Sequence, residues 1–159
     1  MTRRHLFNAV IVAAVAVLAG GVASADMSKN VIAAFRGQLV VTKGDLPEGK
    51  SEKETISKIK AAKLSELQGQ VNGDVKQWTF NYAAFLTKTG ATSLKLEFWR
   101  EGKQYSADKS LSGVDPKSSL LTGEITIDED ENISPGKSYT LKLVAGSDSV
   151  VASTTLVMK

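Results

Sequence analysis

Three oxygen-bearing side chains at alternate positions of one segment are the first pattern in this chain that could do chemistry. They are Asp128, Asp130 and Asn132, and Ca²⁺ takes hard oxygen ligands of this kind. An EF-hand loop is excluded, because Ile133 occupies its glycine position and Tyr139 its bidentate glutamate position. An interstrand calcium site would need carboxylates from other loops, so a solvated acidic turn is the preferred interpretation. We expect no metal and no cofactor.

Two short motifs are typical of serine acyl transfer. Ser57–Lys60 matches S-x-x-K, and Lys88-Thr89-Gly90 matches K-T-G. That chemistry also requires an S-D-N motif, which the chain lacks, and a larger fold than this one. A solvated helix face and a turn explain both motifs. No carboxylate pair for glycoside hydrolysis stands out either, so a small hydrolase is the least favoured function.

An aromatic pair indicates binding rather than catalysis. If Leu94, Leu96 and Phe98 face the core, the alternation of side chains along this strand turns Trp99 outward. Tyr105 follows across a short hairpin, and whether it shares the face of Trp99 stays open. An outward Trp can bind a protein partner or stack on a sugar ring. Two alternatives remain open. Trp99 could pack beneath a helix expected at Ser51–Gln68, or the register could be shifted by one so that Trp99 is a core residue.

The first 25 residues have the pattern of a cleavable export signal. Arg3 and Arg4 precede the apolar run Leu6–Leu18, and Ala23-Ser24-Ala25 is a small-residue cleavage site. The run is short for a membrane span and is diluted by Ala and Gly, so we expect cleavage rather than anchoring. An ordinary signal is preferred to a twin-arginine signal. The sequence therefore predicts an exported protein, in the periplasm, at the cell surface or secreted, with no membrane span after cleavage.

Removal of that segment would also remove the chain's one histidine, His5. The remainder has neither His nor Cys, which excludes Cys nucleophiles, His general bases, disulfides and His or Cys metal sites. Without Arg3 and Arg4, 18 of the 20 Lys and Arg residues face 17 Asp and Glu residues, a net charge of +1. No basic stripe with interleaved aromatics is present, so nucleic acid is not an expected partner.

The rest of the chain is predicted to form one mainly β domain over residues 33–159, after a flexible lead-in at residues 26–32. One amphipathic helix, Ser51–Gln68, follows the first strand and begins with a capping box formed by Ser51 and Glu54. Period-2 alternation and turn residues predict seven strands. These strands are residues 33–42, 75–86, 94–99, 103–111, 120–128, 137–145 and 149–158. A two-sheet antiparallel sandwich buries so many half-apolar strands.

The segment Ile133–Leu143 resembles the entry to the penultimate strand of fibronectin type III and related immunoglobulin-like domains. In those domains an apolar residue, a Pro-Gly turn and a Tyr form the tyrosine corner, whose hydroxyl bonds back to the backbone. The resemblance implies this structural role for Pro135, Gly136 and Tyr139, with Trp78 or Phe98 as the large central aromatic. It implies a seven-stranded antiparallel immunoglobulin-like sandwich, as in small exported bacterial proteins, although the Cys pair is missing and a helix is inserted. It implies no activity.

These observations predict a non-catalytic binding or structural module of the cell envelope. A protein is the preferred partner, contacted through the sandwich face that carries Trp99 and Tyr105. The alternative is a carbohydrate-binding module in which the same two aromatics stack on sugar rings.

Overall fold

The computed structural model describes residues 27–159, so the expected signal peptide at residues 1–25 lies outside the described part. The described residues form two α-helices, one 3₁₀ helix and nine strands. The helices are α1 (Lys29–Ala34), α2 (Glu52–Ala62) and η1 (Glu129–Glu131). The strands are β1 (Leu39–Thr42), β2 (Glu66–Leu67), β3 (Gln70–Asn72), β4 (Val75–Phe85), β5 (Ser93–Arg100), β6 (Gln104–Ser112), β7 (Leu120–Asp128), β8 (Lys137–Ala145) and β9 (Ser149–Met158).

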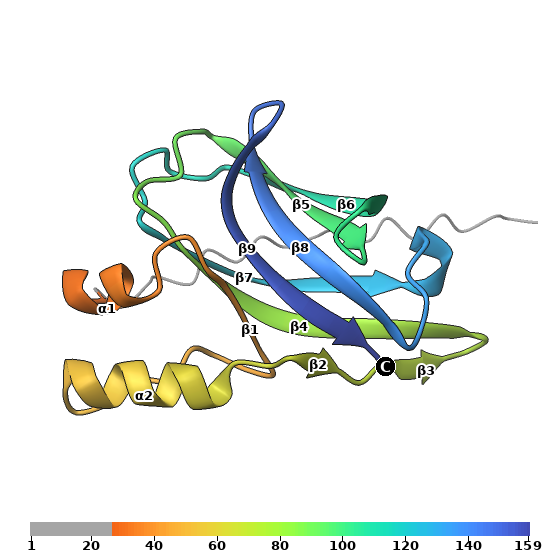
Figure 1. Ribbon diagram of the computed structural model, residues 1–159, viewed down its shortest axis with the longest axis horizontal. Coiled ribbons are helices and arrows are strands. Elements are labelled where there is room, and N and C mark those ends of the chain that lie inside the picture. The colour runs from red at the N-terminus through yellow and green to blue at the C-terminus, as the bar shows by residue number, and fades with distance from the viewer. Residues whose placement is uncertain (1–26) are drawn as a thin grey trace, which may run out of the picture.

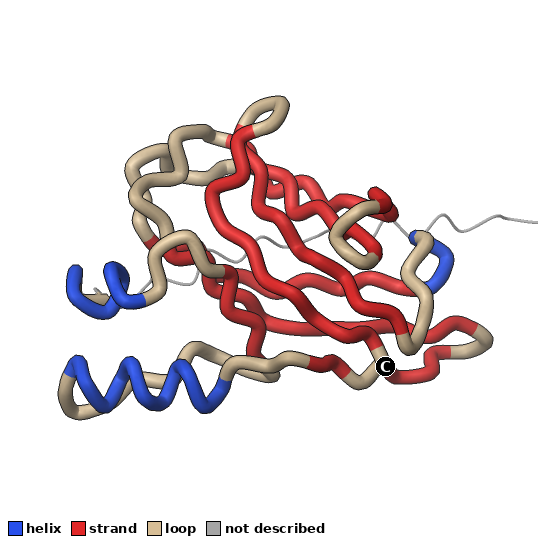
Figure 2. The backbone as a smooth tube through the Cα atoms, in the orientation of Figure 1, coloured by secondary structure: helices blue, strands red, loops and turns tan. Residues whose placement is uncertain are grey.

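The strands form two sheets packed face to face (Figures 1 and 2). In the first sheet, β4 pairs with β1 and β3 along one side and with β7 along the other. The second sheet has the order β2-β9-β8-β5-β6. Every pairing between strands is antiparallel except that of β2 with β9. Six of the seven expected strands are present to within one residue at either end, and the short β2 and β3 are added to them. The first strand, expected at residues 33–42, is shortened to Leu39–Thr42, because Ala33 and Ala34 belong to α1 and the chain turns before β1 begins.

The core between the sheets is built by the alternation of side chains along each long strand. Trp78, Phe80 and Tyr82 point inward from β4, and Leu96 and Phe98 point inward from β5. Both candidates for the central aromatic, Trp78 and Phe98, are completely buried. The sandwich therefore carries a large aromatic from each sheet.

The turn before β8 has the geometry of a tyrosine corner. Tyr139 is fully buried, and its hydroxyl accepts a hydrogen bond of 2.8 Å from the backbone N–H of Ser134. Gly136 lies at φ 75°, where an L side chain would be strained, and its N–H donates to the carbonyl of Met158. Together with the division of the strands between two sheets, this corner makes the fold an immunoglobulin-like β-sandwich.

A second, smaller core lies on the outer face of the first sheet. Phe85 of β4 packs against Phe35 with ring centroids 5.0 Å apart, and Ile59 of α2 joins them. Both helices cover this face at one end of the sandwich (Figure 1). The lead-in expected at residues 26–32 is wrong from Lys29 onward, where α1 begins with Ser28 as its N-cap. The apolar Val31 and Phe35 bury themselves against the sheet, which is why this short helix forms.

The expected helix after the first strand is present, but it ends at Ala62 rather than Gln68. Beyond Ala62 the chain turns back into the sandwich, because the N–H of Leu64 donates to the carbonyl of Val41. Leu67, which fits the helical stripe, lies instead in β2 and points into the main core. Burial of that leucine outweighs the local helical pattern.

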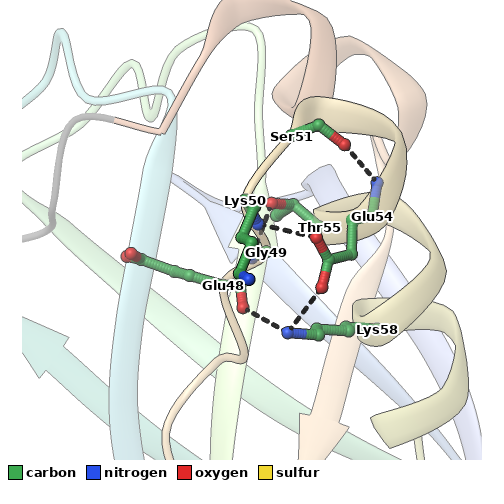
Figure 3. Close-up of polar contacts among 7 residues, drawn as sticks. All are labelled: Glu48, Gly49, Lys50, Ser51, Glu54, Thr55 and Lys58. Carbon is green, nitrogen blue, oxygen red and sulfur yellow. Dashed lines mark hydrogen bonds and ion pairs between the residues drawn. The ribbon is translucent and has the colours of Figure 1, made fainter.

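The start of α2 contains half of the predicted capping box. The Ser51 hydroxyl accepts from the N–H of Glu54, as expected, but the Glu54 carboxylate accepts from the N–H of Lys50 instead of from Ser51 (Figure 3). The same carboxylate forms an ion pair of 3.0 Å with Lys58, one turn along the helix. The Lys58 hydrogen bond and the Lys50 N–H lower the pKa of Glu54.

We expect Tyr139→Phe to lower the free energy of unfolding by about 1–3 kcal/mol, because the Ser134 N–H would lose its partner inside the protein. Urea denaturation measures the change. Tyr105→Phe is the matched control, because it removes the hydroxyl of an exposed tyrosine and should change stability by about 0.5 kcal/mol or less. Equal losses in the two variants would contradict a corner role for Tyr139.

We expect the Glu54 carboxylate to stabilise the fold at neutral pH and to lose this effect in acid. A carboxyl group with a lowered pKa in the folded state adds stability above its unfolded pKa near 4.5, and the effect disappears as the pH falls through the lower folded value. Denaturation of wild type and Glu54→Gln from pH 7 to pH 2 should therefore give curves that converge in acid. A difference that is constant over this range would contradict the prediction.

Candidate functional site

Trp99 lies on the outward face of the second sheet. Leu94, Leu96 and Phe98 are buried in the core, and Trp99 follows Phe98 on the opposite face of β5, where it is half-buried. The contacts of Trp99 come from β5, β6 and β8 of its own sheet, whereas α2 packs on the other sheet. The register therefore places Trp99 neither in the core nor beneath the helix.

A β-bulge places Tyr105 beside Trp99. Phe98 pairs with Ala107, but the next residue, Trp99, pairs with Tyr105, so β6 contains one extra residue at this point. The two rings meet edge to face, with centroids 5.7 Å apart and an interplanar angle of 79°. The structure thus brings together the two binding residues predicted from the sequence.

Two charged side chains complete the surroundings of the indole. Glu97, two residues back on β5, accepts a hydrogen bond of 2.8 Å from Trp99 Nε1. Lys142 of β8 places its ammonium 4.1 Å from the centre of the Trp99 ring, a cation–π contact. Sequence reasoning missed Lys142, which has the right parity on β8 but becomes a neighbour of Trp99 only through the pairing of β5 with β8.

Tyr105 is the most exposed member of this group, with 48% of its surface accessible. Its hydroxyl donates to Asp108 Oδ2 at 2.7 Å, and Lys95 lies 3.5 Å from the same carboxylate oxygen. The hydrogen bond to Asp108 raises the pKa of Tyr105 to about 12, because ionisation would lose the bond and set two negative charges side by side.

A shallow cavity of about 210 Å³ opens beside the indole, and we call it the Trp99 pocket. Its polar lining comes from β5, β8 and the turn between β8 and β9, and its apolar lining includes Val150, which is 51% exposed. The lining residues are Glu97, Trp99, Lys142, Val144, Ser147, Asp148 and Val150. Two carboxylates, one ammonium and one indole therefore share a single small hollow.

A second cavity, of about 350 Å³, lies between the beginnings of α1 and α2. Its polar groups hold the local structure together: Ser28 and Ser51 cap the two helices, and Thr55 accepts from the N–H of Gly49 (Figure 3). Hydrogen bonds from Ser28 and Asn30 lower the pKa of Glu52, which joins the two helices. One wall is Met27, the first residue that the structure describes. We therefore build no functional site here.

Two carboxylates of the acidic segment, residues 128–132, make contacts that stabilise the fold. Glu129 accepts from the N–H of Lys76, and Glu131 pairs with Lys109. Within residues 27–159, no three acidic, His or Cys side chains gather where a metal could bind. Of the calcium candidates, Asp128 precedes η1, Asp130 is exposed within it, and Asn132 ends it at φ 62°.

The acyl-transfer motifs lie in ordinary structural positions. Ser57 and Lys60 are exposed on α2. Thr89 is buried and its hydroxyl donates to the carbonyl of Asp115, so the K-T-G residues lie in the loop between β4 and β5 and join it to the loop before β7. Neither motif gains a partner that would activate a serine.

Comparison with known proteins adds a structural likeness. No family model matches the chain, and no curated protein matches it. Among solved structures, it is similar to an immunoglobulin-like protein from Pseudomonas aeruginosa, with 11% sequence identity and a TM-score of 0.39. The match covers 77% of this chain and 90% of that one. A likeness at this level carries nothing about ligand or activity.

We expect Asp108→Asn to lower the pKa of Tyr105 from about 12 toward the ordinary value near 10, because the charged acceptor is removed. NMR titration of the Tyr105 ring between pH 8 and pH 11 tests this. The wild-type ring should stay protonated over that range, and the variant should titrate within it. Tyr82, whose pKa burial raises to about 12, is the internal control and should not respond. A wild-type Tyr105 that titrates near pH 10 would contradict the assignment.

Proposed function

We propose that this protein is an exported, non-catalytic binding or structural module of the cell envelope. It contacts a protein partner through the outward face of its second sheet, centred on Trp99. The observation that carries this proposal is a half-buried tryptophan on the solvent side of the sandwich, held in place by Glu97, Tyr105 and Lys142. Ordered aromatics that are partly exposed are the residues most often found at the energetic centre of protein interfaces.

The surroundings of Trp99 support a protein contact over a glycan contact. Sugar rings stack on an open aromatic face, and the ammonium of Lys142 lies over the Trp99 ring. The mixture of Tyr105, Val150 and charged groups around it is typical of an interface with an apolar centre and a polar rim. Glycan binding through the same aromatics is the alternative function.

A hydrolase is the third possibility, and one feature bears on it. Glu97 and Asp148 line the Trp99 pocket together, as a pair of catalytic carboxylates would. The pocket volume of about 210 Å³ is below the range of about 300–1,000 Å³ typical of small-molecule sites. The absence of His and Cys after residue 5 also removes the commonest catalytic groups. We therefore place binding before catalysis.

Export rests on the sequence of residues 1–25, with its basic start, apolar run and Ala-Ser-Ala ending. In the part that the structure describes, no helix has the length and apolar character needed to cross a membrane.

Cross-linked affinity capture from envelope extract tests the proposal. The purified protein is the bait, and Trp99→Ala should lower recovery of one partner protein at least about tenfold, as loss of a central contact does. Tyr105→Ala, on the same face, should also lower recovery. Val71→Ala is the matched control, because Val71 is 75% exposed on β3 of the other sheet, and it should recover as much as wild type. Circular dichroism confirms that each variant is folded.

Two outcomes would contradict the proposal. Equal recovery with wild type and Trp99→Ala would remove Trp99 from any interface. Loss of the captured protein in excess free sugar, accompanied by a glycan-dependent change in Trp99 fluorescence, would favour the carbohydrate-binding alternative.

A further inference from the structure

Negative charges outnumber positive charges in the lining of the Trp99 pocket. Glu97 and Asp148 supply two carboxylates, and Lys142 supplies one ammonium. The pocket also offers an indole face and the exposed side chain of Val150. Two carboxylates beside an aromatic ring attract a cation through both ion pairing and the ring quadrupole.

Lys142 occupies the position that an incoming cation would take. Glu97 and Lys142 are directly opposite in the pairing of β5 with β8, where two opposite charges commonly form an ion pair. The Lys142 ammonium lies instead 4.1 Å from the centre of the Trp99 ring. Within residues 27–159 the ion pairs do not include Lys142, Glu97 or Asp148. The ring therefore carries an internal cation, while within this range neither carboxylate is in an ion pair, although Glu97 Oε2 accepts from Trp99 Nε1.

We propose that the Trp99 pocket receives an arginine side chain of the protein partner. Its guanidinium displaces the Lys142 ammonium from the indole and pairs with Glu97 and Asp148. This proposal rests on the proposed function and specifies the chemistry of the partner.

Arginine fits this pocket better than lysine does. A guanidinium is planar, stacks on an indole and presents several donors in a fixed fork, whereas an ammonium is compact and strongly hydrated. With about 210 Å³, the pocket suits one side chain rather than a larger ligand. Asp148 is exposed at the turn between β8 and β9, where a partner side chain can approach it.

The experiment follows the indole N–H of Trp99 by NMR while small probes are added at millimolar concentration. The chain has two tryptophans, so a Trp99→Phe spectrum assigns the signal, and the buried Trp78 serves as internal reference. The probes are N-acetyl-arginine amide and N-acetyl-citrulline amide, which has nearly the same shape without the charge. N-acetyl-glutamate amide is the anionic probe.

Two variants test the mechanism without removing the ring. Lys142→Met keeps the aliphatic stem and removes the competing cation, so it should tighten binding of the arginine probe about two- to fivefold, corresponding to one exposed cation–π contact. Glu97→Gln keeps an oxygen that can accept from Trp99 Nε1 and should weaken binding about two- to fivefold, as loss of an exposed ion pair does. Lys95→Met, which removes a cation paired with Asp108 outside the pocket, is the control and should leave the affinity unchanged.

Equal shifts from arginine and citrulline would overturn the proposal, and so would weaker arginine binding in Lys142→Met. A response to the glutamate probe that is lost in Lys142→Met would also overturn it, by showing that Lys142 recruits an anionic partner. These failures can be told apart from failure of the proposed function. If the captured protein still depends on Trp99 while the arginine probe gives no specific shift, the interaction face stands and its cationic ligand does not.

Discussion

Alternate side chains of β4 are buried in two different cores, and the rest of the structure depends on this constraint. Trp78, Phe80 and Tyr82 fill the space between the two sheets, while Ala83 and Phe85 pack under the helices. β4 also pairs with β1 and β3 on one side and with β7 on the other. A shift of one residue in the register of β4 would exchange the two sets of side chains. This one strand therefore fixes both the register of the first sheet and the surface on which α1 and α2 pack.

The sequence predicted the long strands well because their apolar residues alternate between turn residues. It failed where distant contacts overrule a local pattern. Leu67 fits the helical stripe of α2, yet it is buried in β2 beside β9, which lies about ninety residues further along the chain. The sequence missed helix α1 for a different reason. Its six residues are too few to give a clear periodic signal, and the helix is stabilised by the packing of Val31 and Phe35 on the sheet.

In the candidate site, too, the sequence predicted what depends on local alternation and missed what depends on strand pairing. Parity along β5 was sufficient to predict that Trp99 faces outward if Phe98 faces inward. The position of Tyr105 depends on a bulge in β6, and one extra residue is not visible in a pattern of alternation. Lys142 reaches Trp99 only because β8 pairs with β5, and strand pairing across different parts of the chain cannot be read from local spacing. The resemblance at residues 133–143 did better, because the tyrosine corner is a local motif whose hydrogen bond spans five residues.

The partners of β9 determine when the fold can be completed. The indole N–H of the buried Trp78 donates to the backbone carbonyl of Lys159, which also accepts from Gly69. A side chain at Gly69 would lie 2.7 Å from that indole nitrogen, so the three groups fit together closely. β9 also joins β8 and β2, which lie far apart along the chain. Pairings this remote raise the contact order, which slows folding, and the hydrogen bond of the buried Trp78 indole exists only when Lys159 is in place beside it.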